Sequence, residues 1–497
     1  MRDVTAATGA HRSVPAGSAA GRADPAAGST DPAAGGTDPA AVAAEVERVR
    51  PWGRDGRGRS LTVRLAQLDG LSRLLRDEHG AILAALARDL GKPGPEAELT
   101  EIGVVAAELK HLRKILPAFL RPESRPMPWQ LQPSTARLEP QPVGVVGVLT
   151  PWNYPLQLAL SPVAGALAAG NAVVLKPSEL APATAALLAD ALPRYLDPAS
   201  VAVLTGGADV AGTLLATPLD HLLFTGGERV GRIVARAAAE TLTPVTLELG
   251  GKCPAYVDAS ADLPVAARRL AWAAFLNAGQ TCTRPDHVLV HIRVAAELTE
   301  LLARAVTAMF GTDPLTSPDL GNIVDRAHTE RLQGMLAGHG GRVVCGGQVD
   351  LDRRRVAPTV VADPAADSAL LTEEVFGPVL PVLTVADAAA ARAHIAARPA
   401  PLAVYVFTAD DDVTRALVDG TRSGAVVVNH ATVQTGSPGL PFGGVGASGW
   451  GAYHGLDSLR TFSHLKPVVT TRTRPDPPLL YPPYTAAKRR LFRLASR

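Results

Sequence analysis

The chain has few of the features that build disulfide-bonded, metal-binding or membrane-spanning proteins. Its 497 residues include only 3 cysteines, too few for a disulfide framework, so a reducing compartment is expected. It has no CxxC pair and no zinc-type spacing of histidines, which predicts no metal site. No apolar run of about eighteen residues, the length of a membrane-spanning helix, occurs, and no apolar signal-peptide core follows Met1. We therefore expect a cytoplasmic protein without a membrane anchor.

Charge of one sign is not in excess either. The chain has 49 Lys and Arg residues against 47 Asp and Glu, for a net charge of +2, so it has no electrostatic reason to bind nucleic acid. Hydrophobic residues make up 47% and charged residues 19%, which is typical of a soluble globular protein whose length exceeds a single core. The basic stretch at residues 488–493 favours a solvated helix end over contact with an anionic membrane.

The first part of the chain has a composition that opposes folding. Residues 1–40 are mostly Ala, Gly, Pro, Thr and Asp, and Asp-Pro-Ala-Ala recurs at Asp24, Asp31 and Asp38. Such a segment buries too little apolar surface to offset the entropy of ordering. We expect a disordered tail, and order from about Val42.

Apolar spacing predicts helices first and alternating strands and helices later. Apolar residues from Leu61 to Leu86 fall near one helical face that ends at Gly91, and those from Ile102 to Leu116 repeat at steps of three and four. Beyond residue 142, apolar runs of strand length alternate with alanine-rich stretches, which predicts a parallel, doubly wound sheet and a second α/β region. The expected strands cover residues 143–149, 172–175, 202–204, 222–224, 288–290 and 403–407.

Two short motifs carry the chemistry. Gly279-Gln280-Thr281-Cys282 places a thiol between small polar residues, and Glu248-Leu249-Gly250-Gly251 places a carboxylate beside glycines that let backbone approach a ligand. Together they supply a nucleophile and a base. Taken alone, Cys282 would be interpreted as an inert, buried core cysteine. The presence of the second motif favours the interpretation of Cys282 as a nucleophile.

Seven segments in order resemble the signature of the aldehyde dehydrogenase superfamily. They are residues 151–155 (PWNYP), 176–179 (KPSE), 224–227 (FTGG), 248–251 (ELGG), 279–282 (GQTC), 374–378 (EVFGP) and 441–446 (PFGGVG). The similarity runs from about residue 42 to the C-terminus. Residues 451–455, 461–464 and 481–484 make the chain most similar to class 3 members, including bacterial coniferyl-aldehyde-type and fatty-aldehyde-type dehydrogenases.

The resemblance implies a thiol mechanism. Attack by Cys282 on an aldehyde gives a thiohemiacetal that loses hydride and becomes a thioester, with Asn153 and the Cys282 backbone N–H stabilising the oxyanion. Glu248 would activate the water that cleaves the thioester, and the presence of this Glu disfavours transfer of the acyl group to coenzyme A. The alternatives are a turn-forming Asn153 and a Glu248 that ends a strand and pairs with Lys252. The Cys282 thiol is expected to have a lowered pKa or a nearby base.

The resemblance also implies a dinucleotide site for NAD, with NADP possible. Lys176 and Glu179 would contact the adenine ribose, Glu374 the nicotinamide ribose and Phe376 the nicotinamide ring. The alternatives are a surface Lys–Glu pair and a turn with a core Phe. Other cofactor-binding positions expected by resemblance are Trp152, Gly226, Gly227, Gly231, Leu249 and Gly250.

The chain departs from the family beside the expected pyrophosphate site. Gly227 and Glu228 stand where Ser and Thr are common in relatives, and Glu228 would repel the pyrophosphate unless it points outward. Residues 431–439 fall where family members line the aldehyde funnel.

The fold class expected is α/β, with a Rossmann-like parallel-sheet cofactor domain, a second α/β catalytic domain and a small oligomerisation element. The NAD(P)-binding domain would comprise residues 41–121 and 143–250, the catalytic domain 251–455, and the oligomerisation and C-terminal element 122–142 and 456–497. The expected enzyme is a homodimer that oxidises a medium-chain aliphatic or aromatic aldehyde to its acid. The alternative is a cysteine-dependent esterase or thioesterase without redox chemistry, which the dinucleotide-type residues disfavour. A purely structural protein is disfavoured because Cys282, Glu248 and Asn153 are all present.

Overall fold

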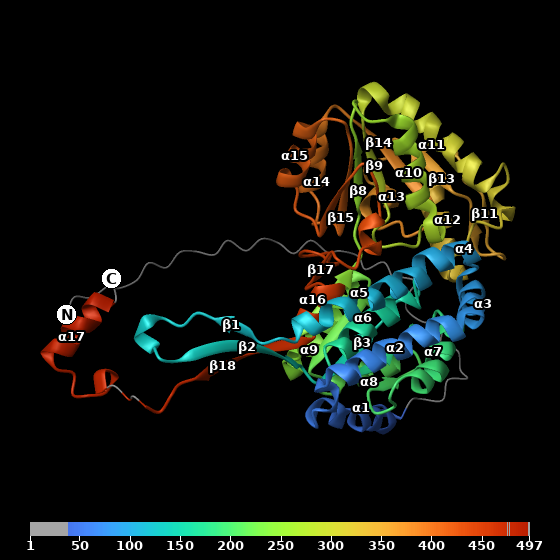
Figure 1. Cartoon of the computed structure of the whole chain (residues 1–497). Coiled ribbons are helices and arrows are strands. Elements are labelled where there is room, and N and C mark those ends of the chain that lie inside the picture. Colours follow the sequence, from blue (N-terminus) through green and yellow to red (C-terminus); the bar gives the residue numbers. More distant parts are fainter. Residues whose placement is uncertain (1–37, 475, 477, 496–497) are drawn as a thin grey trace, which may run out of the picture.

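The structure is a computed structural model that describes residues 38–474, 476 and 478–495. The tail expected to be disordered, residues 1–40, lies almost wholly outside the described residues. The first described element is α1 (Pro39–Arg54), whose cap Asp38 accepts a hydrogen bond from the Ala40 N–H. Figure 1 shows two α/β bodies and a narrow β arm that projects from the first of them.

The first body contains a six-stranded sheet in the order β17-β7-β6-β3-β4-β5, parallel except for β17. Its strands are β3 (Val145–Leu149), β4 (Ala172–Lys176), β5 (Val201–Val203), β6 (His221–Gly226), β7 (Val245–Leu249) and β17 (Gly449–Trp450). Every residue of β3 and β4 is buried, as expected for parallel strands covered on both faces. The strand order reverses between β3 and β6, and open sheets of this type bind ligands beyond the carboxyl ends of the strands at such a point.

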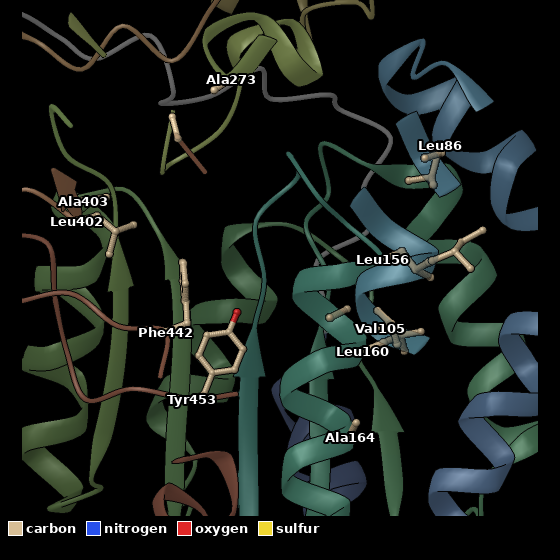
Figure 2. Close-up of a cluster of buried hydrophobic side chains, with 14 of the residues drawn as sticks. Leu86, Val105, Leu156, Leu160, Ala164, Ala273, Leu402, Ala403, Phe442 and Tyr453 are labelled. Carbon is tan, nitrogen blue, oxygen red and sulfur yellow. The ribbon is translucent and has the colours of Figure 1, made fainter. Parts of the chain in front are cut away.

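Helices cover this sheet on both sides. They are α2 (Leu61–Asp77), α3 (His79–Leu90), α4 (Gly94–Ala97), α5 (Gly103–Phe119), α6 (Gln157–Ala168), α7 (Pro182–Tyr195), α8 (Ala208–Ala216) and α9 (Glu228–Thr241). The helical face predicted from Leu61 to Leu86 belongs to two helices, because the chain breaks at Glu78. Between α4 and α5 lies a π-helical turn (Glu98–Ile102) that apolar spacing did not predict. All twelve residues of α6 are buried, and Figure 2 shows Leu160 of α6 close to Val105 of α5 in the core.

The second body contains a seven-stranded sheet in the order β10-β13-β14-β9-β8-β15-β16, parallel except for β10. Its strands are β8 (Pro254–Val257), β9 (His287–His291), β10 (Arg342–Cys345), β13 (Thr359–Ala362), β14 (Val379–Val385), β15 (Ala403–Phe407) and β16 (Ala425–Val428). Its helices are α10 (Leu263–Phe275), α11 (Ala295–Phe310), α12 (Arg326–Ala337), α13 (Ala369–Thr372), α14 (Ala388–Ala396) and α15 (Asp411–Gly420). A small hairpin of β11 (Val349–Asp350) and β12 (Arg355–Val356) lies at its side.

The arm is a three-stranded antiparallel sheet in the order β1-β2-β18. Its strands are β1 (Glu123–Arg125), β2 (Thr135–Pro142) and β18 (Ser463–Thr470), which follows α16 (Gly455–Thr461). Figure 1 shows the arm extending away from both bodies, with α17 (Ala486–Ala495) beyond its tip. No helix within the described residues combines the length and the apolar character needed to cross a membrane.

Candidate active site

Cys282 lies in a loop of the second body that forms hydrogen bonds with the turn after β3 of the first body. The loop precedes β9 and follows a short turn (Leu276–Gly279) in which Asn277, Ala278 and Gly279 have φ of 55°, 51° and 72°. Three successive residues in the left-handed region are costly unless the surroundings fix them, and such strain is typical of functional sites. A Cβ on Gly279 would lie 2.2 Å from the Gly377 carbonyl oxygen, so only glycine fits there.

A cavity of about 260 Å³ opens onto Cys282. Its walls come from the π-helical turn, α5, α6, α10 and the segments around residues 432–436 and 442–454. The lining residues are Leu99, Thr100, Val104, Tyr154, Gln157, Leu158, Trp272, Leu276, Thr281, Cys282, Thr283, Thr432, Val433, Thr435, Gly436, Phe442, Tyr453 and His454. Leu99 and Val433 are 60% and 45% exposed, so apolar side chains border its opening to solvent. Phe442 and Tyr453, which lie next to each other in Figure 2, both line this cavity, and their ring centroids are 5.7 Å apart.

The Cys282 thiol is not acidified by its surroundings. Burial, followed by the charges of Glu374 and Glu248, raises the pKa of the Cys282 thiol to about 12, while the backbone N–H groups of Cys282 and Thr283 oppose this shift. In the protein alone the pKa of the Cys282 thiol is therefore raised rather than lowered. The other expected route, a nearby base, remains.

Glu248 is one of two acids near the thiol, and the other, Glu374, accepts a hydrogen bond from the Gly251 N–H. Glu248 ends β7, is 2% exposed, and neither of its carboxyl oxygens has a hydrogen-bond partner among the described residues. Burial raises the pKa of Glu248 well above 4.5. The alternative pairing with Lys252 does not occur, since the Lys252 ammonium binds Asp286 and the carbonyls of Leu370 and Glu373. A buried carboxyl without partners is costly to the fold, and such groups gather at functional sites.

Asn153 follows β3 and reaches the same loop. Its Nδ2 donates to the Gln280 carbonyl at 3.0 Å, which leaves one N–H of the amide for another acceptor. Its Oδ1 is buried without a partner among the described residues. The hydroxyl of the neighbouring Tyr154 forms a hydrogen bond with Thr281 Oγ1 at 2.6 Å. The structure thus brings Asn153, Cys282 and Glu248 from β3, the loop before β9 and β7 to one place.

Six of the expected cofactor residues lie around the ends of β3 and β7, the loop before β14 and the part of α9 that packs on Leu249. The Trp152 and Phe376 rings meet edge to face with centroids 5.4 Å apart, and Glu374 accepts a hydrogen bond from the Gly251 N–H at 3.1 Å. A Cβ on Gly250 would lie 2.3 Å from a Glu374 carboxyl oxygen, and one on Gly231 would lie 2.6 Å from Leu249 Cδ2. Gly250 and Gly231 are therefore fixed by close packing.

The remaining expected cofactor residues lie further along the same sheet edge. Lys176 is buried at the end of β4 and pairs with the half-exposed Glu179 at 2.5 Å. Gly226 ends β6, and Gly227 caps α9 with open space where its Cβ would be. Glu228 turns along α9 to Arg232, and the pair is exposed. The ends of β4 and β7 are three strand spacings apart, about 14 Å. A ligand that contacts residues at both strand ends must therefore be extended along this edge of the sheet.

Several site residues carried no recognisable signal in the sequence. Lys92, Glu101 and Asn277 contact the Asn153 turn, and Leu99 and Trp272 line the cavity. Of the expected funnel segment, Thr432, Val433, Thr435 and Gly436 line the cavity. Among the residues that the structure describes, no group of three or more His, Cys, Asp or Glu side chains is placed to hold a metal ion.

Known proteins share this sequence and architecture. The model of the Aldehyde dehydrogenase family matches residues 32–468. Aldehyde dehydrogenase family 3 member B1 of Rattus norvegicus is 42% identical over 453 residues, 91% of this chain and 96% of that protein. Aldehyde dehydrogenase family 3 member A2 of Mus musculus is 40% identical over 452 residues, 89% and 92% of the two chains.

Solved structures agree with this match. The substrate-bound AldH of Staphylococcus aureus has a TM-score of 0.89 and 37% identity and covers 91% of this chain and 99% of its own. A Mycobacterium tuberculosis aldehyde dehydrogenase complexed with NAD+ has a TM-score of 0.79 and 29% identity, with 87% and 90% covered. These likenesses extend over both bodies and the site between them. The chain therefore belongs to the aldehyde dehydrogenase family and is an oxidoreductase of that family.

Proposed function

We propose that this enzyme oxidises an uncharged, largely apolar aldehyde to its carboxylic acid with NAD(P). The observation that carries the proposal is the set of groups around Cys282, which lines an apolar cavity: the Asn153 amide binds the Gln280 carbonyl two residues before it, and the partnerless Glu248 carboxyl is close enough for its charge to act on the thiol. A nucleophile, an N–H donor and a base at one point are the groups that acyl chemistry on a thiol needs.

Residues of the chain supply the nucleophile, the donors to the oxyanion and the base for hydrolysis. The Cys282 sulfur bonds to the aldehyde carbon as the thiol proton passes to solvent water at the open mouth of the cavity, and the free N–H of Asn153 and the Cys282 backbone N–H hold the oxyanion. Loss of hydride from the thiohemiacetal leaves a thioester on Cys282. Glu248 then takes a proton from the water that attacks this thioester, and the acid leaves as the thiol re-forms. Burial raises the pKa of Glu248, which makes its carboxylate a stronger base.

The strand ends fit a dinucleotide. The first turn of α9 leaves backbone N–H groups without helical partners, and Gly227 leaves open space beside them. Lys176 and Glu179 would hold the adenine ribose, and Trp152, Gly226, Gly231, Leu249, Gly250, Glu374 and Phe376 would complete the site. NAD(P)+ supplies the hydride acceptor when bound. Glu179 favours NAD because a carboxylate repels a 2′-phosphate.

The cavity supports the choice of aldehyde. Its lining contains no Asp, Glu, Lys or Arg, and burial lowers the pKa of its one histidine, His454, to about 4, so that this side chain is neutral at pH 7. A charged group on the substrate would lose its hydration there without gaining a partner. Medium-chain aliphatic and aromatic aldehydes meet these conditions.

Steady-state oxidation tests the proposal. Purified enzyme would be assayed for reduction of NAD and of NADP with aliphatic and aromatic aldehydes, and with matched aldehydes that end in a carboxylate. The uncharged aldehydes should have kcat/KM higher by about 10-fold or more. Turnover of esters without any cofactor reduction would support the hydrolase alternative, and equal kcat/KM for both aldehyde sets would contradict the cavity argument.

We also propose a homodimer formed through the arm and a cytoplasmic location. Leu465 and Val469 of β18 are 41% and 56% exposed, which suits a surface that a second copy covers. Cys282 must remain a thiol to react, which favours a reducing compartment. Within the chain, we assign cofactor binding to residues 41–121 and 143–250, catalysis to 251–455, and assembly to 122–142 and 456–497.

A further inference from the structure

A buried ion pair lies next to the active site and outside every motif used so far. Lys92 Nζ and Glu101 Oε1 are 2.5 Å apart, and both side chains are fully buried. Lys92 follows the end of α3, and Glu101 lies in the π-helical turn before α5. Burying such a pair is costly unless its remaining donors and acceptors are satisfied, and π-helical turns occur often at functional sites.

The remaining groups of the pair bind one segment, the turn between β3 and α6. Glu101 Oε2 accepts hydrogen bonds from the backbone N–H groups of Leu156 at 3.1 Å and Gln157 at 2.8 Å. Lys92 Nζ donates to the Asn153 carbonyl at 3.3 Å and lies 4.2 Å from the centroid of the Tyr154 ring. The ion pair therefore holds both ends of the turn that carries Asn153.

The other side of this turn binds the loop of the nucleophile. Asn277 Nδ2 donates to the Asn153 carbonyl at 2.8 Å and to the Gln280 carbonyl at 3.1 Å, and Asn153 Nδ2 donates to the same Gln280 carbonyl at 3.0 Å. The Asn153 carbonyl thus has two donors, Lys92 from the first body and Asn277 from the second. Its peptide plane, and with it the direction of the Asn153 amide, is set by both.

We propose that Lys92 and Glu101 are positioning residues that hold the Asn153 amide against Cys282 so that it can donate to the oxyanion. This inference rests on the proposed function, because the oxyanion arises when Cys282 attacks a carbonyl. An apolar pair of similar size would fill the space but would leave the Leu156 and Gln157 N–H groups without acceptors. The charges therefore orient the turn as well as pack it.

The test compares a reaction of Cys282 that forms an oxyanion with one that does not. Release of nitrophenol from p-nitrophenyl acetate requires attack at a carbonyl and needs no cofactor. Alkylation of Cys282 by iodoacetamide displaces iodide directly and forms no oxyanion. Lys92→Met and Glu101→Gln should slow nitrophenol release, and kcat for aldehyde oxidation, by about 10-fold to 100-fold, since about 1 Å of misplacement can cost about 10²-fold. The alkylation rate and the Kd for NAD, measured by calorimetry, should change by less than about 3-fold.

Two controls separate positioning from general damage. Lys252→Met breaks another largely buried pair of a lysine with a carboxylate, and Lys252 also binds the loop at residues 370–373. This variant should bind NAD more weakly, and its rate of nitrophenol release should stay close to that of wild type. In an Asn153→Ala background, Glu101→Gln should add nothing further to the loss, because both changes remove the same donor. Glu101→Gln keeps one acceptor oxygen for the turn but loses the charge that pairs with Lys92, and it carries the test if Lys92→Met does not fold.

The proposal is overturned if nitrophenol release is unchanged in a folded variant, or if alkylation and NAD affinity fall in parallel with it. It is also overturned if Glu101→Gln and Asn153→Ala act additively. Failure of the proposed function would give a different result, because wild-type enzyme would then reduce no cofactor with any aldehyde. The ester and alkylation rates of the variants would still show whether the ion pair positions Asn153.

Discussion

Glu248 is the residue whose environment is hardest to explain by folding alone. A carboxyl at the end of β7 that is buried without a partner destabilises the native state, yet it lies close enough to Cys282 for its charge to raise the pKa of that thiol. Its chemistry gives a reason for its place: a base must be free of other bonds to take a proton from water. The GG pair after it was visible in the sequence, but the absence of a partner was not.

Replacing Glu248 with Gln should separate hydride transfer from hydrolysis. The variant should reduce about one equivalent of cofactor per site rapidly and then turn over slowly, with steady-state kcat lower by about 10²-fold to 10⁴-fold. Rapid mixing with absorbance of the reduced cofactor measures both phases. Unchanged steady turnover would show that another group activates the water.

A second buried acid makes stability depend on pH. Burial raises the pKa of Glu108 from 4.5 to about 7, although the Glu108 carboxyl accepts a hydrogen bond from the Gly455 N–H. The folded state therefore binds a proton more tightly than the unfolded state, and this contribution is fully present below pH 4.5 and is lost as pH rises to about 7. Glu108→Gln should remove it, so the free energy of unfolding of the variant relative to wild type should rise over this range by up to about 3 kcal/mol.

Urea unfolding of both proteins at several pH values measures that difference. Gln keeps an acceptor for the Gly455 N–H, so the comparison isolates the charge. A constant difference between variant and wild type from pH 4.5 to pH 7 would contradict a raised pKa in the folded state.

At the scale of elements, the start of α9 carries the clearest departure from the family. Glu228 would place a negative charge beside the proposed pyrophosphate site, but it turns along the helix to Arg232. Exposed pairs of this kind contribute little to stability, so the pair matters more for the local potential. The orientation could not be predicted from Gly227 and Glu228 alone, because it depends on which residue lies one helical turn further on.

Removal of Arg232 should leave the negative charge of Glu228 uncompensated. Arg232→Ala should raise the Kd for NAD by about 3-fold to 10-fold at low salt and leave kcat unchanged, with the effect shrinking as salt screens the charge. The double variant Glu228→Gln with Arg232→Ala should bind NAD about as tightly as wild type. If Arg232→Ala binds NAD normally at low salt, Glu228 is too distant to matter.

Elements also show where sequence patterns succeed. The strands expected at residues 172–175, 222–224 and 403–407 form as predicted, because a buried parallel strand needs a continuous apolar run. The π-helical turn and the Lys92–Glu101 pair were not predicted, because their hydrogen bonds join the turn at residues 153–157 to residues far away in the chain. Periodicity detects local faces, and it does not detect which distant backbone groups a buried charge will satisfy.

At the scale of the whole molecule, the two α/β bodies lie next to each other, and the arm projects from the first of them (Figure 1). The motifs indicate the nature of the proposed site, since those at residues 151–155, 176–179, 224–227 and 248–251 fall at the carboxyl ends of strands of the first sheet. Their mutual placement depends on the packing of two sheets, which no single segment encodes.

The arm should control assembly. Val469→Lys should shift the enzyme from dimer to monomer in sedimentation velocity, because it places a charge on an exposed apolar part of β18. Leu242→Lys, which changes an 89% exposed leucine at the end of α9, serves as the matched control and should remain dimeric. A dimer that persists in Val469→Lys would place the interface elsewhere.

The measurement that tests the central claim most directly is reduction of NAD(P) by wild-type enzyme and by Cys282→Ala with an apolar aldehyde, with the acid product quantified in parallel. The account predicts one acid formed per cofactor reduced in wild type, and neither product from folded Cys282→Ala that still binds NAD. Cofactor reduction that persists in Cys282→Ala would contradict the thiol mechanism.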